Sequence, residues 1–314
     1  MSFPRPTALG VKAALFYLLI LGAFYAARYS NLFFLLVVFL TVLAVHGLLA
    51  ARRNLAGVTG RFEEIEPTAA GTGAEVRAHV GAEKRARFGL GVELRIDGAA
   101  PYTIATGYVD RELSVSGRLP PLPRGIYPIT SANVVTTWPL GLFRFRRAVD
   151  APERVVVFPT PAPRETPAAG GVGLGELLSR QGSAGMMQPS HLREYRPGDE
   201  LRRVHWKASA RRRNLVVQEW EGGTGAGHEI VLDRRTSNDG LEEALSLLSA
   251  LALAAKEEKE PLTLHSQGLD ATFGANFRPW EELFAFLAAA DALPRNAEAP
   301  PVAAPYVPRL GGTA

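Results

Sequence analysis

The 314-residue sequence contains no cysteine. This absence excludes disulfide bonds, cysteine-ligated zinc and every thiol nucleophile, including the triad of a transglutaminase-type enzyme. The sequence also lacks a G-x-S-x-G nucleophile elbow, an H-E-x-x-H zinc motif and a Walker A loop, and its six histidines are scattered. We therefore expect a protein that is not an enzyme and that requires no cofactor.

Long runs of one charge are also scarce, and the net charge of +4 is modest for this length. A small and mainly local positive charge is only weak support for a nucleic-acid-binding protein. The length corresponds to two domains at about 150 residues each. Hydrophobic residues make up 47% of the chain, which is enough to build cores for both.

Two uncharged stretches lie near the N-terminus, at Ala13 to Ala27 and Leu32 to Ala51. The second is long enough to cross a hydrocarbon core of about 30 Å at about 1.5 Å per residue. The first is short, and it would span if the bilayer thinned locally and Lys12 reached the head groups. The brief linker Arg28-Tyr29-Ser30-Asn31 then predicts a transmembrane helical hairpin over residues 1–57.

Cationic residues flank this pair of stretches on both outer sides. They are Arg5 and Lys12 before it, Arg52, Arg53 and Arg61 after it, and Arg28 alone between the two. The positive-inside rule then places both ends and the soluble domains in the cytoplasm. The alternative is a cleaved signal peptide, which would leave the second stretch as an anchor and the soluble part outside.

Residues 58–160 alternate between apolar and polar positions and are punctuated by glycine and proline. The alternating apolar positions are Val76, Ala78 and Val80, Val92, Leu94 and Ile96, Leu113 and Val115, and Val155 and Val157. This pattern predicts an antiparallel β-sandwich. We assign no chemistry to this domain, and residues 161–190 are interpreted as a Gly/Pro-rich linker.

Residues 191–293 contain a strand at His228 to Asp233, a helix at Leu241 to Lys259, a strand at Pro261 to Ser266 and a helix at Pro279 to Leu293. One face of the first helix is apolar, through Leu241, Leu245, Leu248 and Ala252. With a further strand at Leu215 to Trp220 beside them, these elements predict a small α/β layer with parallel strands. The overall fold class is thus α+β and multidomain, and residues 294–314 are predicted to be a disordered tail.

The most distinctive segment covers residues 191–221, where charged and aromatic side chains are concentrated. Pro197-Gly198 suits a type II turn, and Asp199 is placed to cap a short helix. A basic loop follows from Lys207 to Arg213, before the strand at Leu215 to Trp220.

This segment closely resembles the signature of a bacterial family known only as domain of unknown function fifty-eight. The matching residues are Arg193, Tyr195, Pro197, Gly198, Asp199, Trp206, Lys207, Ala210 and Arg211. A weaker likeness extends upstream, and downstream to a von Willebrand factor A-like half-domain. The resemblance implies a protein tethered to the bacterial inner membrane that works beside a MoxR-type AAA+ ATPase, with a reduced von Willebrand A-like domain.

A von Willebrand A-type domain commonly holds a divalent cation through an Asp-x-Ser-x-Ser loop. The corresponding stretch here is Asp233-Arg234-Arg235-Thr236-Ser237, in which Asp233 and Ser237 match and Arg235 replaces the middle serine. Guanidinium groups beside the loop repel a dication. We therefore predict no bound metal, with Asp233 and Ser237 as degenerate candidates if a metal-dependent ligand-binding module is present after all.

The signature supplies the predicted binding residues: Arg193, Tyr195, Asp199, Arg203, Trp206, Lys207 and Arg211. Tyrosine, tryptophan and arginine dominate interface hot spots, so we predict a docking face for the ATPase, on a non-catalytic adaptor or scaffold for the assembly or maturation of protein complexes. One alternative is purely structural, with ion pairs and aromatic rings joining two domains. Another is contact between the basic residues and anionic lipid or, less favoured, nucleic acid.

Overall fold

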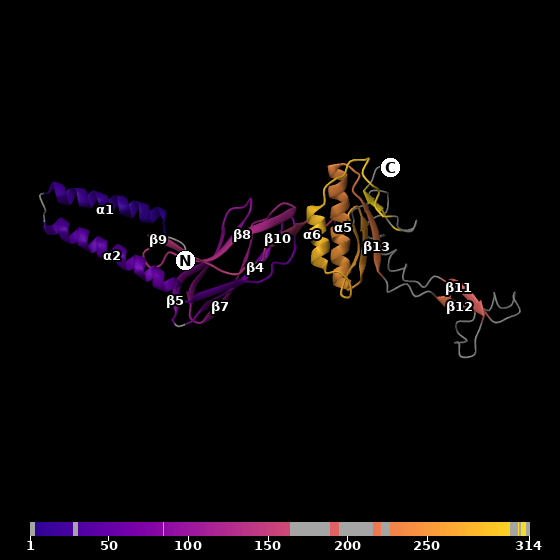
Figure 1. The fold of residues 1–314 in the computed structure, drawn as a ribbon, viewed down its shortest axis with the longest axis horizontal. Coiled ribbons are helices and arrows are strands. Elements are labelled where there is room, and N and C mark those ends of the chain that lie inside the picture. Colours follow the sequence, from indigo (N-terminus) through magenta and orange to yellow (C-terminus); the bar gives the residue numbers. More distant parts are fainter. Residues whose placement is uncertain are drawn as a thin grey trace. The chain divides into compact units, whose positions relative to one another are not determined.

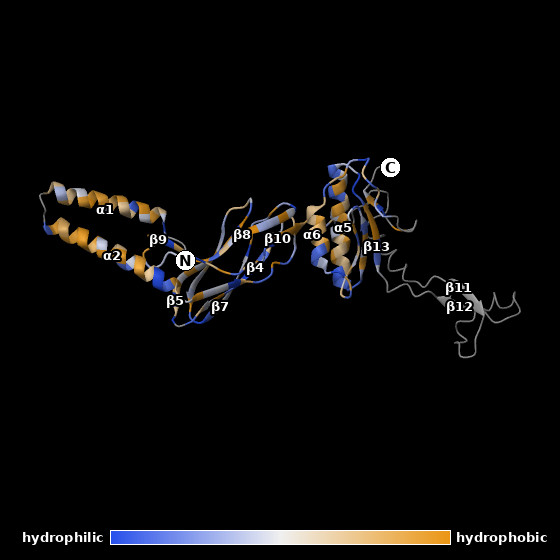
Figure 2. Cartoon of the chain, viewed as in Figure 1, coloured by the Kyte–Doolittle hydropathy of each residue, from blue (hydrophilic) through white to orange (hydrophobic). Residues whose placement is uncertain are grey.

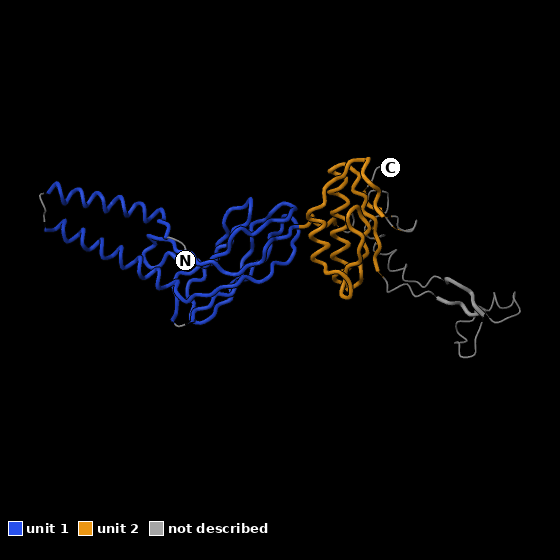
Figure 3. The backbone as a smooth tube through the Cα atoms, viewed as in Figure 1, with its two compact units in different colours: residues 1–157 blue, residues 158–314 orange. Residues whose placement is uncertain are grey.

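The computed structural model describes residues 4–27, 31–83, 85–163, 189–194, 216–220, 227–301, 307 and 309–311. The chain divides into two compact units, Met1–Val157 and Phe158–Ala314 (Figures 1 and 3). The linker predicted at 161–190 lies mostly outside the described residues, as does most of the signature.

Unit 1 begins with a short strand β1 (Arg5–Pro6) and two helices, α1 (Ala8–Ala26) and α2 (Asn31–Leu55). Both helices are long and apolar enough to cross a membrane. Their large apolar side chains lie mostly on the outside, as Leu35 at 64% exposure illustrates. Figure 2 colours α2 as mainly hydrophobic along most of its length. α1 begins five residues before the uncharged stretch because Thr7 caps it, accepting a hydrogen bond from the Gly10 amide at 3.0 Å.

The rest of unit 1 consists of two antiparallel sheets (Figure 1). The smaller sheet has the order β2-β4-β7, and its strands are β2 (Val58–Phe62), β4 (Glu75–Ala82) and β7 (Glu112–Arg118). The larger sheet has seven strands, with the order β1-β9-β8-β10-β3, and β5 pairs with both β8 and β6. Besides β1, its strands are β3 (Thr68–Ala69), β5 (Arg87–Ile96), β6 (Tyr102–Val109), β8 (Gly125–Thr136), β9 (Phe143–Ala148) and β10 (Arg154–Phe158).

Side chains of both sheets share one hydrophobic core. The predicted alternation is confirmed on β4, where Val76 is buried and the adjacent Arg77 is exposed. On β5 and β10 the predicted positions Val92 and Val155 are buried, but so are their neighbours Glu93 and Val156, so burial does not alternate there. On β7 the apolar positions Leu113 and Val115 are only half-buried and pack against the edge of the core.

The base of the helical hairpin belongs to the same core. Leu55 is fully buried in it, and β1 pairs with β9 so that Arg5 lies opposite Arg144. The buried Asn54 side chain donates to the carbonyl oxygen of Phe88 at 2.7 Å and accepts from the Phe88 amide at 3.3 Å. The hairpin is therefore fixed to the sheets at the start of α1 and at the end of α2.

The described residues of unit 2 contain a four-stranded sheet in the order β15-β14-β13-β16 and the two helices α5 and α6. The strands are β13 (His228–Asp233), β14 (Leu262–Ser266), β15 (Leu269–Phe273) and β16 (Arg309–Gly311), and the helices are α5 (Asn238–Glu258) and α6 (Trp280–Ala289). β13 pairs in parallel with β14 and β16, and β15 is antiparallel. The predicted face of α5 is buried along its whole length.

Two expectations for this unit need correction. The strand found at β12 (Val216–Trp220) does not join the α/β sheet but pairs antiparallel with β11 (Pro189–Glu194) in a separate two-stranded sheet. The tail predicted to be disordered contributes β16, which extends the parallel sheet beside β13. Backbone pairing at the sheet edge orders this short segment, although its composition is that of a loop.

Candidate functional site

The signature residues lie almost entirely outside the described part of the chain. Arg193 is the exception, and its backbone lies in β11 opposite Val217 of β12. The other predicted binding residues are outside the described residues, and they are Tyr195, Asp199, Arg203, Trp206, Lys207 and Arg211. A docking role for the signature therefore stays a prediction.

Asp233 and Ser237, the degenerate metal candidates, lie at the end of β13 and just before α5. Arg235 donates to both carboxylate oxygens of Asp233, with Nη2 at 2.8 Å from Oδ2 and Nε at 3.0 Å from Oδ1. Gln267 Nε2 adds a third bond to Oδ1 at 2.9 Å. The hydrogen bonds from Arg235 are the main reason that the pKa of the Asp233 carboxyl falls to about 2.

Ser237 is the N-cap of α5, where its hydroxyl oxygen accepts from the amide of Gly240 at 3.2 Å. Both candidate ligands thus have structural partners, and a cation at Asp233 would have to displace the guanidinium group of Arg235.

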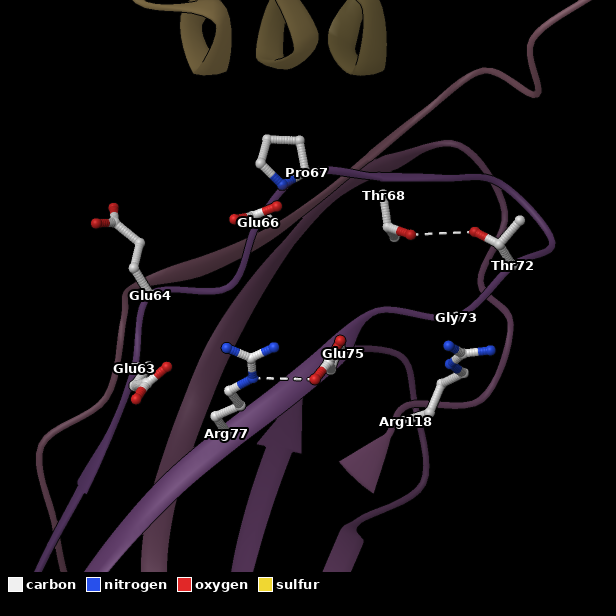
Figure 4. A pocket seen from close by; sticks show the side chains of 10 residues that line it. All are labelled: Glu63, Glu64, Glu66, Pro67, Thr68, Thr72, Gly73, Glu75, Arg77 and Arg118. Carbon is white, nitrogen blue, oxygen red and sulfur yellow. Dashed lines mark hydrogen bonds and ion pairs between the residues drawn. The ribbon is translucent and has the colours of Figure 1, made fainter. Parts of the chain in front are cut away.

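Unit 1 contains a polar cavity of about 360 Å³ in the domain to which the sequence assigned no chemistry (Figure 4). It lies between the segment that connects β2 to β4 and the ends of β4 and β7, and it is lined by Glu63, Glu64, Glu66, Pro67, Thr68, Thr72, Gly73, Glu75, Arg77 and Arg118. Figure 4 shows Arg77 paired with Glu75 through a 3.0 Å hydrogen bond from Nε to Oε1. The short acidic run from Glu63 to Glu66 was the available signal in the sequence, but acidic residues outside strands are common.

His79 and Ser114 on the smaller sheet form a chain of hydrogen bonds with Glu63, which follows β2 and lines the cavity. The Ser114 hydroxyl lies 2.9 Å from His79 Nδ1, and His79 Nε2 lies 2.6 Å from Glu63 Oε1. The bond with His79 lowers the pKa of the Glu63 carboxyl. This order resembles that of a serine hydrolase, but His79 and Ser114 are directly opposite cross-strand neighbours on a regular sheet. Such pairs stabilise sheets without any catalytic role.

Unit 2 holds two further histidines that contact carboxylates. His265 on β14 has a separate carboxylate at each ring nitrogen, with Asp270 Oδ1 2.8 Å from Nδ1 and Glu229 Oε1 3.1 Å from Nε2. His228 at the start of β13 is only 2% exposed, and its Nε2 lies 3.2 Å from Glu260 Oε2.

Burial lowers the pKa of the His228 imidazole, and nearby Glu260 and Glu258 oppose that effect. His228 was counted among the scattered histidines of the sequence, because its acidic neighbours lie some thirty positions further along the chain.

Comparison with known proteins links the second half of the chain to a family without an assigned function. Residues 191–265 match the family described as "Protein of unknown function DUF58". Over 167 residues the chain is 28% identical to the uncharacterized protein YeaD of Bacillus subtilis (strain 168). The alignment covers 51% of this chain and 41% of YeaD, so the chain spans less than half the length of that relative.

Two solved structures of the CARDB domain of PF1109 from Pyrococcus furiosus were also found. The solution structure shares 17% identity and the crystal structure 19%, each over 32% of this chain and over 94% and 91% of the domain. The TM-score is 0.22 in both cases, which is too low to define a common fold.

Proposed function

We propose that this protein is a membrane-anchored, non-catalytic adaptor whose soluble units engage a protein partner at the membrane surface. The observation that carries the proposal is the contrast within the helical hairpin. Its outer surface is apolar and exposed along both helices, whereas its base is built into the core of unit 1. An exposed apolar surface of this length is unfavourable in water and favourable in a bilayer.

Three exposed aromatic residues beside the hairpin base support membrane attachment. Phe88, Tyr108 and Trp138 are 46%, 53% and 39% exposed, and the Phe88 ring lies 5.2 Å from Tyr108 and 5.9 Å from Trp138. Phe88 is also the residue that Asn54 of α2 holds by two hydrogen bonds. Tryptophan and tyrosine favour the head-group region, so this aromatic cluster fits a position at the bilayer interface.

The loop before β9 fits the same position. Leu140 packs against Gly47 of α2, and the carbonyl oxygen of Leu142 lies where a side chain on Gly10 of α1 would be. The Thr7 amide donates to that carbonyl oxygen at 3.0 Å. Both glycines thus permit a close approach between the helices and an apolar loop. Under the proposal, Leu140 and Leu142 would lie where the helices enter the bilayer.

The flanking cations favour a location in the bacterial inner membrane with both soluble units on the cytoplasmic side. A periplasm-active phosphatase fused after Ala56 should therefore be inactive in cells, and the same fusion placed after Tyr29 between the helices should be active. Activity of the Ala56 fusion would contradict the proposed orientation.

The proposed partner is a MoxR-type AAA+ ATPase that acts in assembly or maturation of protein complexes. This choice rests on the resemblance of residues 191–221 to the family signature. We interpret the two antiparallel sheets around one core as a β-sandwich. The parallel strands with α5 and α6 are interpreted as a reduced von Willebrand A-like domain. Tyr195, Trp206 and the arginines of the signature are the proposed contacts.

Affinity purification of the tagged full-length protein from native membranes in mild detergent tests the adaptor proposal. We expect an AAA+ ATPase to be enriched, and to be lost from Trp206→Ala and Arg203→Glu. Arg77→Glu, an exposed charge reversal in unit 1, is the matched control and should retain the ATPase. Retention of the partner by both folded signature variants, or a parent preparation without any ATPase, would contradict the proposal.

A further inference from the structure

Three potential metal ligands meet at one end of unit 2, where the structure of the backbone holds them in place. His228 is the first residue of β13, and Glu258 is the last residue of α5. Lys259 then adopts a left-handed conformation with φ of 59°, which ends the helix and turns the chain toward Glu260.

Two backbone hydrogen bonds fix this turn relative to the strand. The amide of Glu260 donates to the carbonyl oxygen of Ala255 at 2.9 Å, and the amide of His228 donates to that of Pro261 at 2.8 Å. The approach of the three side chains therefore follows from regular structure on both sides, namely a capped helix and the start of a parallel strand pair.

We propose that His228, Glu258 and Glu260 form a binding site for a divalent metal ion of the zinc type. One ligand atom from each side chain lies within 4.8 Å of the other two. Zinc bonds to nitrogen and oxygen measure about 2.0–2.2 Å, so neighbouring ligand atoms of a tetrahedral centre are about 3.3–3.5 Å apart. The observed separation of His228 Nε2 and Glu260 Oε2 is 3.2 Å, close to this spacing.

The ligand types decide which cation fits. Magnesium and calcium prefer oxygen ligands only, whereas zinc and its neighbours among the first-row metals bind imidazole nitrogen together with carboxylate oxygen. Two carboxylates would also balance the charge of a dication. Three protein ligands leave a fourth position for water, so this is an open site rather than a closed structural one.

Among the described residues of unit 2, the carboxylate-bonded groups at His265 and at Asp233 do not offer this geometry. The two carboxylates at His265 contact different ring nitrogens, so a single ion cannot bind the imidazole and both acids in the same way. Asp233 is held by Arg235, which repels a cation. An ion pair between the buried His228 and the half-buried Glu260 is the alternative explanation, and it does not require a side chain at the exposed Glu258.

Calorimetric titration of the full-length protein with zinc chloride tests the site. The protein carries a tag without histidine, is purified in mild detergent and is treated with a chelator that is then removed. We expect one zinc ion per chain at micromolar affinity or tighter, and no binding of magnesium at the same concentrations. Glu258→Gln and Glu260→Gln should each weaken zinc binding at least about tenfold, as expected on loss of a metal ligand.

Glu257→Gln is the matched control, because it removes the same charge from an exposed neighbour at the same helix end. It should bind zinc like the parent. His228→Gln should abolish binding, and the two glutamate variants keep the test decisive if that buried substitution prevents folding. Absence of stoichiometric zinc binding by the parent, or unchanged affinity in Glu258→Gln, would overturn the proposal. The outcome does not depend on whether an ATPase partner is found.

Discussion

Two long, leucine-rich helices of this protein, α2 and α5, have opposite relations to their surroundings. α5 buries one face against the sheet of unit 2 and presents charged residues such as Glu243 and Glu257 outside. α2 carries no charged residue before Arg52, and most of its leucine, valine and phenylalanine side chains are exposed. The number of apolar residues therefore does not determine a helix's partner. Their distribution does, since an amphipathic stripe selects a protein core and a uniformly apolar surface selects lipid.

The sharpest test of this comparison is the same substitution in both helices. Leu248→Ala in α5 removes a fully buried side chain. It should lower the free energy of unfolding of unit 2 by about 3 kcal/mol, from lost burial and the cavity left behind. Leu35→Ala in α2 should change stability in detergent by less than about 0.5 kcal/mol, because detergent or lipid fills the space. Denaturant unfolding followed by circular dichroism measures both, and equal losses would remove the distinction between the helices.

The surroundings of α2 and α5 also differ in charge. α2 has no charged residue before Arg52, whereas the carboxylate of Asp233 is buried in unit 2 near the start of α5. Its folded-state pKa of about 2 lies below the ordinary value of 3.8. This shift corresponds to about 2 kcal/mol of stability that is present above pH of about 4 and is lost as the pH falls toward 2. Unfolding titrations between pH 5 and 2 should show this slope, and Asp233→Asn should flatten it.

Asp239→Asn in the first turn of α5 serves as the control for the pH experiment, because it makes the same charge change at an exposed position. A parent slope unchanged by Asp233→Asn would show that Arg235 does not stabilise the carboxylate in solution.

The attachment of the hairpin to the sheets gives a smaller expected effect. Asn54→Ala removes hydrogen bonds to the backbone of Phe88 and to the Thr136 hydroxyl in a buried position. We expect unit 1 to lose about 1–3 kcal/mol, typical of buried polar groups that lose their partners. Thermal unfolding in detergent measures the loss, and a stability equal to that of the parent would mean that the helices do not depend on this contact.

The smallest effect is expected between the two apolar helices themselves. The Tyr17 hydroxyl and the Thr41 hydroxyl are 3.0 Å apart and join α1 to α2. Hydrogen bonds between membrane helices contribute about 0.6 kcal/mol on average, so Thr41→Val should change helix association only slightly. Cross-linking of cysteines introduced in both helices would report this, and separation of the helices in Thr41→Val would show that the bond matters more than packing.

The sequence predicted the regular elements that depend on local pattern. The alternation around Val76 and the helical face from Leu241 to Ala252 are confirmed, because burial on one side repeats with the period of the element. Around Val92 both faces of β5 are buried, including Glu93, and an alternating pattern does not predict this. The uncharged stretch begins after Lys12, whereas α1 begins at Ala8, because the N-cap at Thr7 and not the loss of charge sets the start of the helix.

The pairing of strands that are distant in the sequence could not be predicted, because it produces no local periodic pattern. β11 and β12 pair across more than twenty residues, and β16 is a three-residue strand whose order depends on the edge of β13. The cluster at His228 and the acidic cavity of unit 1 combine side chains from separate elements. Single-sequence reasoning places residues on elements, whereas these sites depend on which elements become neighbours.

The double attachment of unit 1 to its helices has a mechanical consequence. A domain on a single flexible linker rotates freely, but here β1 holds the start of α1 to β9 and Asn54 holds the end of α2 to β5. The apolar loop around Leu140 and Leu142 occupies the space beside both helices. Unit 1 therefore moves with the hairpin as one rigid lever, and any force or partner that tilts α1 and α2 also tilts the sheets.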